Sequence, residues 1–412
     1  MYTEIERCRI CNNSNLISIM DLGEQTLSGV FPKSADEIIA AGPVELVKCK
    51  GETSCGLVQL KQSYSLDDMY GENYGYRSGL NAQMVSHLQS KVQKILDMDV
   101  LKPGDIVVDI GSNDATTLRS YPQDQYNLIG IDPTGKKFAS YYPDTITLVP
   151  DFFSAAAIQS VLGDQRATVI TSFAMFYDLE DPVQFAREVN ASLADNGIWV
   201  FEQSYLPAML EASAFDTICH EHLEFYALKQ IEWITKAAGL KILDVENNDV
   251  NGGSFSIIAC KSTSTQVAKE SHLQSIRDRE ISLHLDDDKI YESFRDHVSK
   301  AKNDLLSFLD QARSEGKSVY GLGASTKGNV LLQYFDITSK LIAGIAEVND
   351  EKFGSFTPGT LIPISPQDEV LARNPDYLLV LPWHFREFFL SHPNFKGKQL
   401  VFPFPKFEIV DT

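Results

Sequence analysis

Apolar positions in the first quarter of the chain follow two different patterns. Residues 1–65 hold short apolar runs such as VELVKC and GLVQL, whose length is typical of short strands. After a polar, tyrosine-rich connector, apolar residues recur with helical spacing from about Ala82 to Met98, in MVSHLQSKVQKILDM. These patterns predict a small N-terminal domain over residues 1–65 and a helix that opens a second domain.

Strand-like and helical runs alternate through the next part of the chain, residues 66–261. PGDIVVDIGSNDATTL has the pattern of a turn, a buried strand, a small-residue loop and a helix, and NLIGID, TITLVP, ATVITSF and GIWVFEQ follow as further strands. Such alternation predicts βαβ units around a parallel sheet. LKILDVENNDVNGGSFSIIAC predicts a terminal hairpin, with Gly252 and Gly253 in its turn and an antiparallel edge.

The last part of the chain predicts a second, smaller α/β domain over residues 262–412. It begins with a charged stretch of long helical periodicity, up to about Gly316. KSVYGLGASTKGNVLLQYF then repeats the strand–loop–helix pattern, and KLIAGIAEVN, DYLLVLPW and QLVFPFP follow as strands. The expected fold class is therefore α/β, with a small N-terminal domain, a Rossmann-like central domain and a C-terminal α/β domain.

Composition and charge exclude several classes of partner. Lys and Arg number 36 against 56 Asp and Glu, which gives a formal net charge of −20. A field of this sign repels nucleic acid phosphates and anionic membranes, so neither is an expected partner. No run approaches the ~20 apolar residues that a membrane span needs. The first residues, MYTEIERCRI, lack the basic and apolar regions of a secretory signal, and we expect a cytoplasmic protein.

Four of the six cysteines lie within the first 55 residues, and their clustering predicts a metal site. Cys8 and Cys11 form a CxxC pair, and Cys49 and Cys55 form a wider second pair. Four thiolates suit a tetrahedral zinc ion, with no position left open for water, so the zinc would be structural. The alternative is a set of free buried cysteines.

Three successive strand ends predict a nucleoside site. The small-residue loop of DIGSND lets the backbone approach a ligand, and an acid ending the next strand can accept hydrogen bonds from ribose hydroxyls. PDFFS, residues 150–154, adds a carboxylate and aromatic rings suited to adenine. No GxxxxGK[ST] motif accompanies this loop, which favours S-adenosylmethionine over ATP. The candidate cofactor residues are Asp109, Gly111, Asn113, Asp132, Pro133, Asp151 and Phe152. The alternatives are a turn role for Asp132 and core packing for Phe152 and Phe153.

The stretch CHEH, Cys219 to His222, follows a predicted strand at the ligand-binding end of the sheet. In an extended segment His220 and His222 share one face and Glu221 points away, whereas in a helix all three fan out. Acid/base chemistry, a buried polar structure and a metal site are the three interpretations, in that order. In the first, His222 is the base, and His220 and Glu221 position it and the substrate.

Three further motifs are candidates for substrate contacts. GLGASTKGN can hold an anion at a helix N-terminus, with Lys327 adding charge, or can be a tight strand–helix turn. LPWHF can bring Trp383 and His384 to the mouth of the site, although a lone histidine is more often structural. YGYRSG, before the first helix of the central domain, can line the same mouth or merely pack.

In joint order, these motifs resemble the sugar C-methyltransferases of deoxysugar biosynthesis, over essentially the whole chain. The resemblance rests on CRIC and CGLVQL, YGYRSG, DIGSND, IDPT, FFS, HEH, GLGASTKGN and LPWHF. It implies a zinc-binding domain, an S-adenosylmethionine-dependent methyltransferase domain and a C-terminal domain that helps to hold a nucleotide-linked keto-sugar. It leaves a monomer and a homodimer equally open.

The resemblance also implies a mechanism. A base removes the proton next to the sugar ketone, and the enolate carbon attacks the sulfonium methyl. The base falls on His222, with Glu221 beside it, and Tyr76 donates a hydrogen bond to the enolate. The implied substrate residues are Tyr74, Arg77, Lys327, Asn329 and His384.

The sequence departs from the family pattern at three places. Cys219 stands where the family pattern has a tyrosine, Ala115 where it often has glycine, and GAST replaces a more apolar run. These departures leave alternatives open: an O- or N-methyltransferase, another nucleotide-sugar enzyme on this scaffold, or a binding protein without catalysis.

Overall fold

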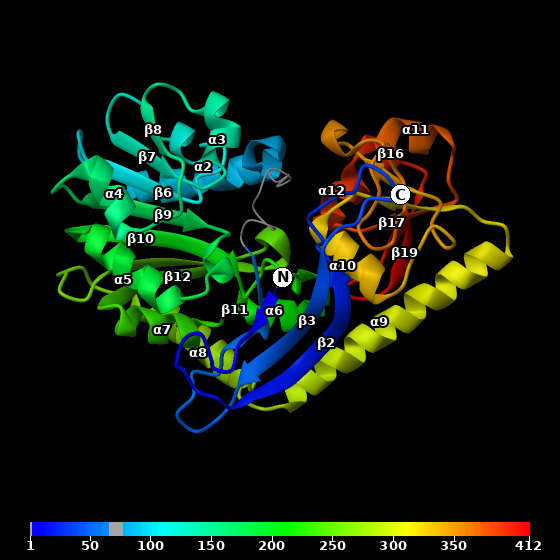
Figure 1. The fold of residues 1–412 in the computed structure, drawn as a ribbon, viewed down its shortest axis with the longest axis horizontal. Coiled ribbons are helices and arrows are strands. Elements are labelled where there is room, and N and C mark those ends of the chain that lie inside the picture. The colour runs from blue at the N-terminus through cyan, green and yellow to red at the C-terminus, as the bar shows by residue number, and fades with distance from the viewer. Residues whose placement is uncertain (1, 66–76) are drawn as a thin grey trace.

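Four sheets organise the chain in a computed structural model that describes residues 2–65 and 77–412 (Figure 1). A central α/β domain and a C-terminal α/β domain face one another, and the long strands of the N-terminal part lie between them (Figure 1). The expected α/β class and its three parts are confirmed. The helices of the described ranges include none that is long and apolar enough to cross a membrane.

The N-terminal part forms a small antiparallel sheet, to which the central part contributes one strand, β11. Its order is β11-β4-β3-β2, and a separate pair joins β1 to β5. The strands are β1 (Tyr2–Glu4), β2 (Leu16–Thr26), β3 (Ala41–Cys49), β4 (Val58–Leu60), β5 (Gln62–Tyr64) and β11 (Glu224–Phe225). Because β11 begins two residues after His222, its pairing with β4 fixes one end of the CHEH segment to the N-terminal sheet.

The central sheet has seven strands in the order β12-β13-β10-β9-β6-β7-β8. Strands β6 to β10 are parallel, and the predicted hairpin forms the antiparallel edge. The strands are β6 (Ile106–Ile110), β7 (Asn127–Ile131), β8 (Ile146–Val149), β9 (Ala167–Phe173), β10 (Leu193–Ser204), β12 (Leu240–Asn248) and β13 (Ser254–Lys261). The helices are α2 (Ala82–Asp97), α3 (Gly135–Phe138), α4 (Ala155–Leu162), α5 (Pro182–Ser192), α6 (Leu206–Ala212) and α7 (Leu228–Ala237).

The C-terminal domain has a six-stranded sheet in the order β16-β15-β14-β17-β18-β19, parallel except for β19. Two helices precede it, and α9 runs along the edge of the molecule (Figure 1). The strands are β14 (Val319–Leu322), β15 (Ile345–Glu347), β16 (Ile364–Pro366), β17 (Tyr377–Val380), β18 (Gln399–Phe402) and β19 (Glu408–Asp411). The helices are α8 (Glu270–Ser282), α9 (Lys289–Ser314), α10 (Thr326–Tyr334), α11 (Gln367–Ala372) and α12 (Arg386–Ser391).

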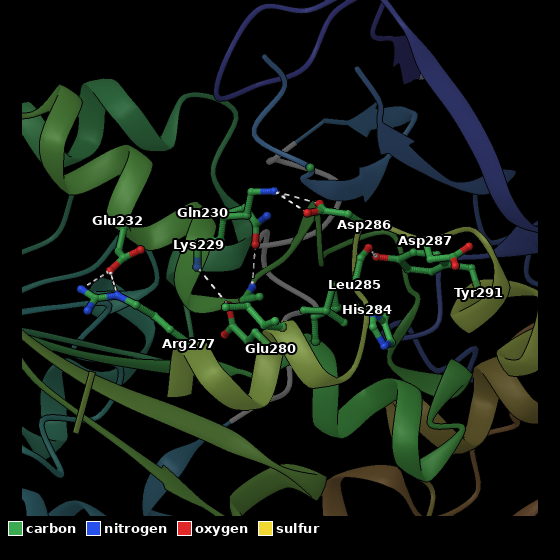
Figure 2. A pocket seen from close by; sticks show the side chains of 14 residues that line it. Lys229, Gln230, Glu232, Arg277, Glu280, His284, Leu285, Asp286, Asp287 and Tyr291 are labelled. Carbon is green, nitrogen blue, oxygen red and sulfur yellow. Dashed lines mark hydrogen bonds and ion pairs between the residues drawn. The ribbon is translucent and has the colours of Figure 1, made fainter. Parts of the chain in front are cut away.

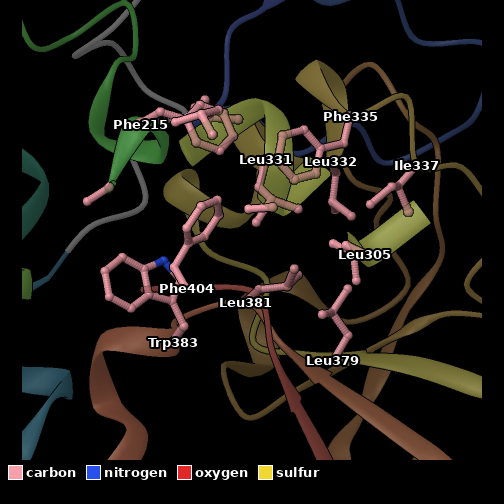
Figure 3. Packing of buried hydrophobic residues seen from close by; sticks show 14 of the residues in the cluster. Phe215, Leu305, Leu331, Leu332, Phe335, Ile337, Leu379, Leu381, Trp383 and Phe404 are labelled. Atoms are coloured by element: carbon pink, nitrogen blue, oxygen red, sulfur yellow. The ribbon is translucent and has the colours of Figure 1, made fainter. Parts of the chain in front are cut away.

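One aromatic side chain from the central part is buried in the core of the C-terminal domain. Phe215 stacks on Phe335 with ring centroids 5.2 Å apart and contacts Phe404 edge-on at 5.6 Å. Figure 3 shows it near leucines of α10, with Phe404 between it and Trp383. Full burial of a phenylalanine stabilises by about 1.5–3 kcal/mol. This packing holds the short 3₁₀ turn Phe215–Thr217, and hence the start of the CHEH segment, against the C-terminal domain.

Candidate functional site

The four N-terminal cysteines converge on one point. Their sulfur atoms all lie within 4.8 Å of one another, and the Cys8–Cys55 and Cys11–Cys49 pairs are each 3.4 Å apart. Zinc–sulfur bonds of ~2.3 Å place the ligands of a tetrahedral site about 3.8 Å apart, so the four thiols fit a zinc ion. The predicted zinc site is confirmed, and four sulfur ligands leave it without an open position for substrate.

Local backbone bonds shape the cysteine cluster. In the CxxC loop the amide of Asn12 donates to the Cys8 carbonyl at 2.9 Å, which curls the loop around the site. The second pair is held where β3 ends at Cys49 and the chain returns toward β4, with the Cys49 amide bonded to the Leu57 carbonyl at 2.8 Å. The Asn13 amide group lies 3.4 Å from the Cys49 sulfur and donates to it. Such a donor stabilises a thiolate ligand.

A cavity of about 280 Å³ opens at the carboxyl ends of β6, β7 and β9. This edge of a parallel sheet is where doubly wound folds bind their ligands. The cavity brings together six of the seven predicted cofactor residues: Asp109, Gly111, Asn113, Asp132, Pro133 and Phe152. The seventh, Asp151, is exposed and does not line the cavity; its carboxylate accepts a bond from the Phe152 amide at 2.8 Å.

The Asp132 carboxylate also holds the loops of the cavity. It accepts hydrogen bonds from the Asn113 amide at 2.8 Å and from the Thr134 amide at 2.7 Å. The first of these bonds ties the DIGSND loop to the end of β7. The Thr134 hydroxyl also donates to Oδ1, at 2.5 Å, so Oδ1 already accepts two bonds, whereas Oδ2 accepts only the Asn113 amide and has room for a ligand hydroxyl.

Asp109 lines the cavity where β6 ends, and burial raises the pKa of its carboxyl to about 7. Bonds from the hydroxyls of Thr171 and Thr117 oppose that rise in pKa. Gly111 follows with φ 70°, and a Cβ there would come within 3.2 Å of the Met175 side chain. A side chain at Gly111 would therefore be strained, and it would crowd the floor on which the ligand lies.

Several lining residues are not visible in the sequence motifs. Met84 and Leu88 reach the cavity from α2, and Met175, Asp178 and Glu180 reach it from the loop after β9. The helical spacing of Met84 and Leu88 was predictable, but it does not say which ligand or layer the helix covers. The loop after β9 carries no glycine motif, and only its position after a parallel strand indicates a binding role.

The CHEH segment forms a turn rather than the extended strand or helix considered from its sequence. The His222 amide donates to the Cys219 carbonyl at 3.2 Å, and the chain then enters β11. The turn sends the two imidazoles to different neighbours. His222 contacts the Tyr177 ring at 4.4 Å, whereas His220 contacts the Tyr64 ring at 4.6 Å.

His222 is partly buried, and its protonation state follows from one bond. Its Nδ1 lies 2.8 Å from the Thr217 carbonyl, which can only accept, so Nδ1 carries the proton and Nε2 holds the lone pair. Burial lowers the pKa of His222, the bond to Thr217 opposes this shift and the charge of Lys327 adds to it, and together they bring the pKa to about 4. The imidazole is therefore neutral at pH 7.

The side chains of His220 and Glu221 face residues of the N-terminal part of the chain, Gln25 and Gly29. His220 is 1% exposed and its Nε2 donates to the Gln25 carbonyl of β2 at 3.1 Å. Burial lowers the pKa of His220 to about 4. A Cβ on Gly29 would lie 2.9 Å from the Glu221 Oε1 atom, and burial raises the pKa of the Glu221 carboxyl. Neither residue lines the cofactor cavity.

Cys219 is almost fully buried rather than open to the cavity. It is 2% exposed, and burial raises the pKa of its thiol, with the Glu221 carboxylate as the next cause. A neutral, enclosed thiol packs as a small apolar group. Compared with the tyrosine expected from the family pattern, Cys219 therefore lacks a hydroxyl and does not supply a reactive thiolate in its place.

Lys327 crosses from the C-terminal domain to the central domain. Its Nζ donates to the Asn251 carbonyl, in the turn of the β12–β13 hairpin, at 2.6 Å. Burial lowers the pKa values of both His222 and His384, and the positive charge of Lys327 adds to this lowering. Lys327 and His384 both reach the turn of the β12–β13 hairpin, where a Cβ on Gly252 would lie 3.9 Å from the Lys327 Nζ and 3.7 Å from the His384 Cβ. Together with His222 they are called the interface cluster.

The remaining predicted substrate residues have protein partners of their own. Asn329 is fully buried, and its amide nitrogen donates to the Ser28 carbonyl at 2.8 Å. Arg77 bonds the Tyr141 hydroxyl and lies 3.8 Å from the Asp114 carboxylate. Tyr74 and Tyr76 lie outside the described residues.

A wider cavity of about 520 Å³ lies apart from this chemistry, between α7, α8 and the start of α9. Figure 2 shows that its charged side chains are paired with one another: Glu232 with Arg277, and Lys229 with Asp286. Glu280 accepts a bond from the Leu228 amide at 2.6 Å at the start of α7. These groups are satisfied within the protein.

Comparisons with known proteins match the three parts of the fold in order. Family models match residues 8–70 as a zinc binding domain, residues 80–245 as a methyltransferase domain and residues 249–405 as a C-methyltransferase C-terminal domain. The C-methyltransferase NovU of Streptomyces niveus is 25% identical over 99% of this chain and 97% of its own length.

Among solved structures, two methyltransferases align with part of the chain. They are CcbJ from Streptomyces caelestis and an S-adenosylmethionine-dependent enzyme from Clostridium acetobutylicum. Each aligns with 42% of this chain at 11% identity and a TM-score of 0.33. The alignment covers 89% of the CcbJ chain and 91% of the Clostridium chain. The family models agree with a zinc ion in the cysteine cluster and with S-adenosylmethionine as the cofactor.

Proposed function

Because this chain is an S-adenosylmethionine-dependent C-methyltransferase of the sugar C-methyltransferase family, we propose that it methylates a nucleotide-linked keto-deoxysugar at the carbon next to the ketone. The observation that carries the proposal is the position of His222. Its ring contacts Tyr177, in the same loop after β9 whose other residues line the cofactor cavity. His222 does not itself line the cofactor cavity. A carbon acceptor that lies between the two would need a base of this kind, because its proton must leave before the carbon can attack.

The proton transfer follows from the tautomer of His222. The ketone acidifies the neighbouring C–H, and Nε2 takes that proton because Nδ1 already donates to Thr217. The electron pair of the C–H bond becomes the enolate of the sugar. S-adenosylmethionine supplies the electrophilic methyl group when bound. The enolate carbon would take that methyl group as the donor sulfur keeps the electron pair of its C–S bond, and the proton would remain on the His222 imidazole until solvent removes it.

The low pKa of His222 in the free protein leaves the imidazole unprotonated, but proton abstraction favours a base whose pKa lies near the working pH. A pKa near 4 keeps the imidazole neutral and able to accept at neutral pH. The negative charge of an enolate near the ring stabilises the imidazolium, so the pKa rises at the moment of transfer. Enolate stabilisation by nearby donors is the larger electrostatic requirement, and we assign it to Tyr76 and to the charge of Lys327.

The interface cluster supports a negatively charged, polar acceptor. Lys327 lies at the start of α10, where burial lowers the pKa of its ammonium group and the Asp216 carboxylate opposes that shift. Ser325 caps the helix by accepting from the Gly328 amide at 3.0 Å. A nucleotide-linked sugar brings a diphosphate, and a lysine near a helix start is suited to bind it. The sugar would then reach His222 from the C-terminal side.

Mass spectrometry of a panel of nucleotide-linked keto-sugars, each incubated with S-adenosylmethionine, tests the proposal. We expect a gain of one methyl group on carbon for at least one keto-sugar and none for sugars without a ketone. Methylation on oxygen or nitrogen, or no gain for any keto-sugar while S-adenosylhomocysteine still binds, would overturn it.

A further inference from the structure

A small chamber of about 20 Å³ adjoins the cofactor cavity. Four apolar residues line both spaces: Met84, Leu88, Phe173 and Ala174. The other wall of the chamber includes Tyr177, which contacts His222, and Asn251, whose carbonyl binds Lys327. The chamber therefore lies between the cofactor, the proposed base and the interface cluster. Its volume holds about one water molecule or one polar substituent.

Three polar residues at the end of β10 line this chamber, Glu202, Gln203 and Ser204, and the first of them is satisfied by the protein. Glu202 is 5% exposed and bonds His87 of α2. Its other oxygen lies 2.7 Å from the Lys91 ammonium and accepts from the Asn248 amide at 2.8 Å. These bonds tie α2 to the sheet and leave little capacity on Glu202 for a ligand.

Gln203 presents the opposite case. It is 1% exposed, and within the described part of the chain neither its amide nitrogen nor its amide oxygen has a hydrogen-bond partner. Leaving a buried donor or acceptor unsatisfied is costly, and nearly all such groups in folded proteins have a partner. The Gln203 amide is buried without a partner and lines a chamber next to the cofactor cavity. This indicates that a group from outside the chain, such as a substrate hydroxyl, forms the missing hydrogen bonds.

We propose that Gln203 selects the acceptor by binding a hydroxyl group on the sugar ring close to the carbon that is methylated. This rests on the proposed function and adds a specificity residue to it. The amide offers two N–H donors and one carbonyl acceptor. A hydroxyl satisfies both kinds of group because it donates and accepts, whereas the ketone of the acceptor can only accept.

Discrimination at such a site is expected to be strong. A pocket built to hydrogen-bond a substrate hydroxyl rejects the analogue that lacks it, because the buried amide is then left unpaired. An acceptor without the hydroxyl would leave Gln203 in the state seen in the free protein, or with a single water molecule.

The test compares Gln203→Met with the wild type on two nucleotide-linked keto-sugars that differ only in one ring hydroxyl. For the wild type we expect kcat/KM to favour the hydroxyl-bearing acceptor by roughly 10²-fold or more. In Gln203→Met this preference should fall to within about 3-fold, through loss on the hydroxyl-bearing acceptor. The melting temperature of Gln203→Met should equal or exceed that of the wild type, because an apolar side chain replaces a buried amide that lacks hydrogen bonds.

Gln230→Met is the matched control. Gln230 is also buried, but its amide donates to the Cys55 carbonyl at 2.7 Å and accepts from the Ala227 amide at 2.9 Å. This variant should melt at a lower temperature and keep the wild-type preference. If Gln203→Met keeps the preference, or if the wild type shows none, Gln203 binds only water and the inference is wrong.

A second measurement separates this inference from the proposed function. If the wild type methylates neither acceptor, the proposed function fails, and calorimetric binding of the two nucleotide-sugars with S-adenosylhomocysteine decides the role of Gln203. Tighter binding of the hydroxyl-bearing sugar, lost in Gln203→Met, supports the inference. Equal binding of both sugars by the wild type overturns it.

Discussion

The Trp383 indole donates a 2.8 Å hydrogen bond to the Asp216 carboxylate, joining the C-terminal domain to the turn before CHEH. Asp216 is fully buried, its other oxygen has no hydrogen-bond partner among the described residues, and burial raises the pKa of its carboxyl. Trp383→Phe would remove the donor and leave a buried carboxyl without a partner. We expect the free energy of unfolding to fall by about 1–3 kcal/mol, measured by urea denaturation.

Trp233→Phe is the control for that change. Trp233 lies on α7 and is 39% exposed, so its substitution should change the free energy of unfolding by less than about 0.5 kcal/mol. Equal losses in the two variants would mean that the bond to Asp216 contributes nothing specific.

The zinc site predicts a structural effect of metal removal. Purified protein should contain one zinc per chain, and Cys8→Ser/Cys49→Ser should lack it and unfold at a lower temperature, since metal binding contributes to folding. Elemental analysis and thermal unfolding measure these outcomes. Chelation that removes zinc without changing the melting temperature would argue against a structural ion.

Asp132→Ala should weaken S-adenosylhomocysteine binding 10- to 150-fold, the equivalent of ~1.5–3 kcal/mol for hydrogen bonds to a charged group. The variant also removes the bond that holds the Asn113 amide. Asp151→Ala is the matched control, because Asp151 is exposed and outside the cavity, and its affinity should stay within about 2-fold. Calorimetry that finds unchanged affinity in Asp132→Ala would reduce Asp132 to a turn residue.

His220 predicts a loss of stability in acid. Its pKa is about 4 in the folded protein, below its ordinary value of 6.5, so between these values the unfolded chain binds a proton that the folded chain does not. Stability is therefore present above pH 6.5 and is lost as pH falls toward 4. His220→Gln, which cannot titrate, should lose about 2 kcal/mol less than the wild type between pH 7 and pH 5. Identical pH profiles in denaturant titrations would show that another group governs the acid loss.

The sequence predicted what short-range spacing determines. The CxxC pair, the strand–loop–helix of DIGSND and the acid ending β7 each lie within a few residues of one another, and the structure brings them together. The predicted hairpin at residues 240–261 also forms, with β12 at the edge of the sheet.

Long-range packing decided the rest. The turn at CHEH depends on Phe215, which packs into a core formed much later in the chain, and on β11, which pairs with a strand near the N-terminus. Neither partner is visible in the local pattern, so the separation of His220 from His222 could not be predicted. The same holds for Gln203, because an amide without a partner is recognised only when all its neighbours are known.

Solvent deuterium exchange tests the role of His222 most directly, because it reports proton removal without methyl transfer. The keto-sugar is incubated in deuterated water with S-adenosylhomocysteine, and mass spectrometry measures deuterium at the carbon next to the ketone. We predict exchange with the wild type and a roughly 10²- to 10⁴-fold slower exchange with His222→Asn, while S-adenosylhomocysteine binds both proteins equally. Exchange at the wild-type rate in His222→Asn would contradict the account, because the base would then lie elsewhere.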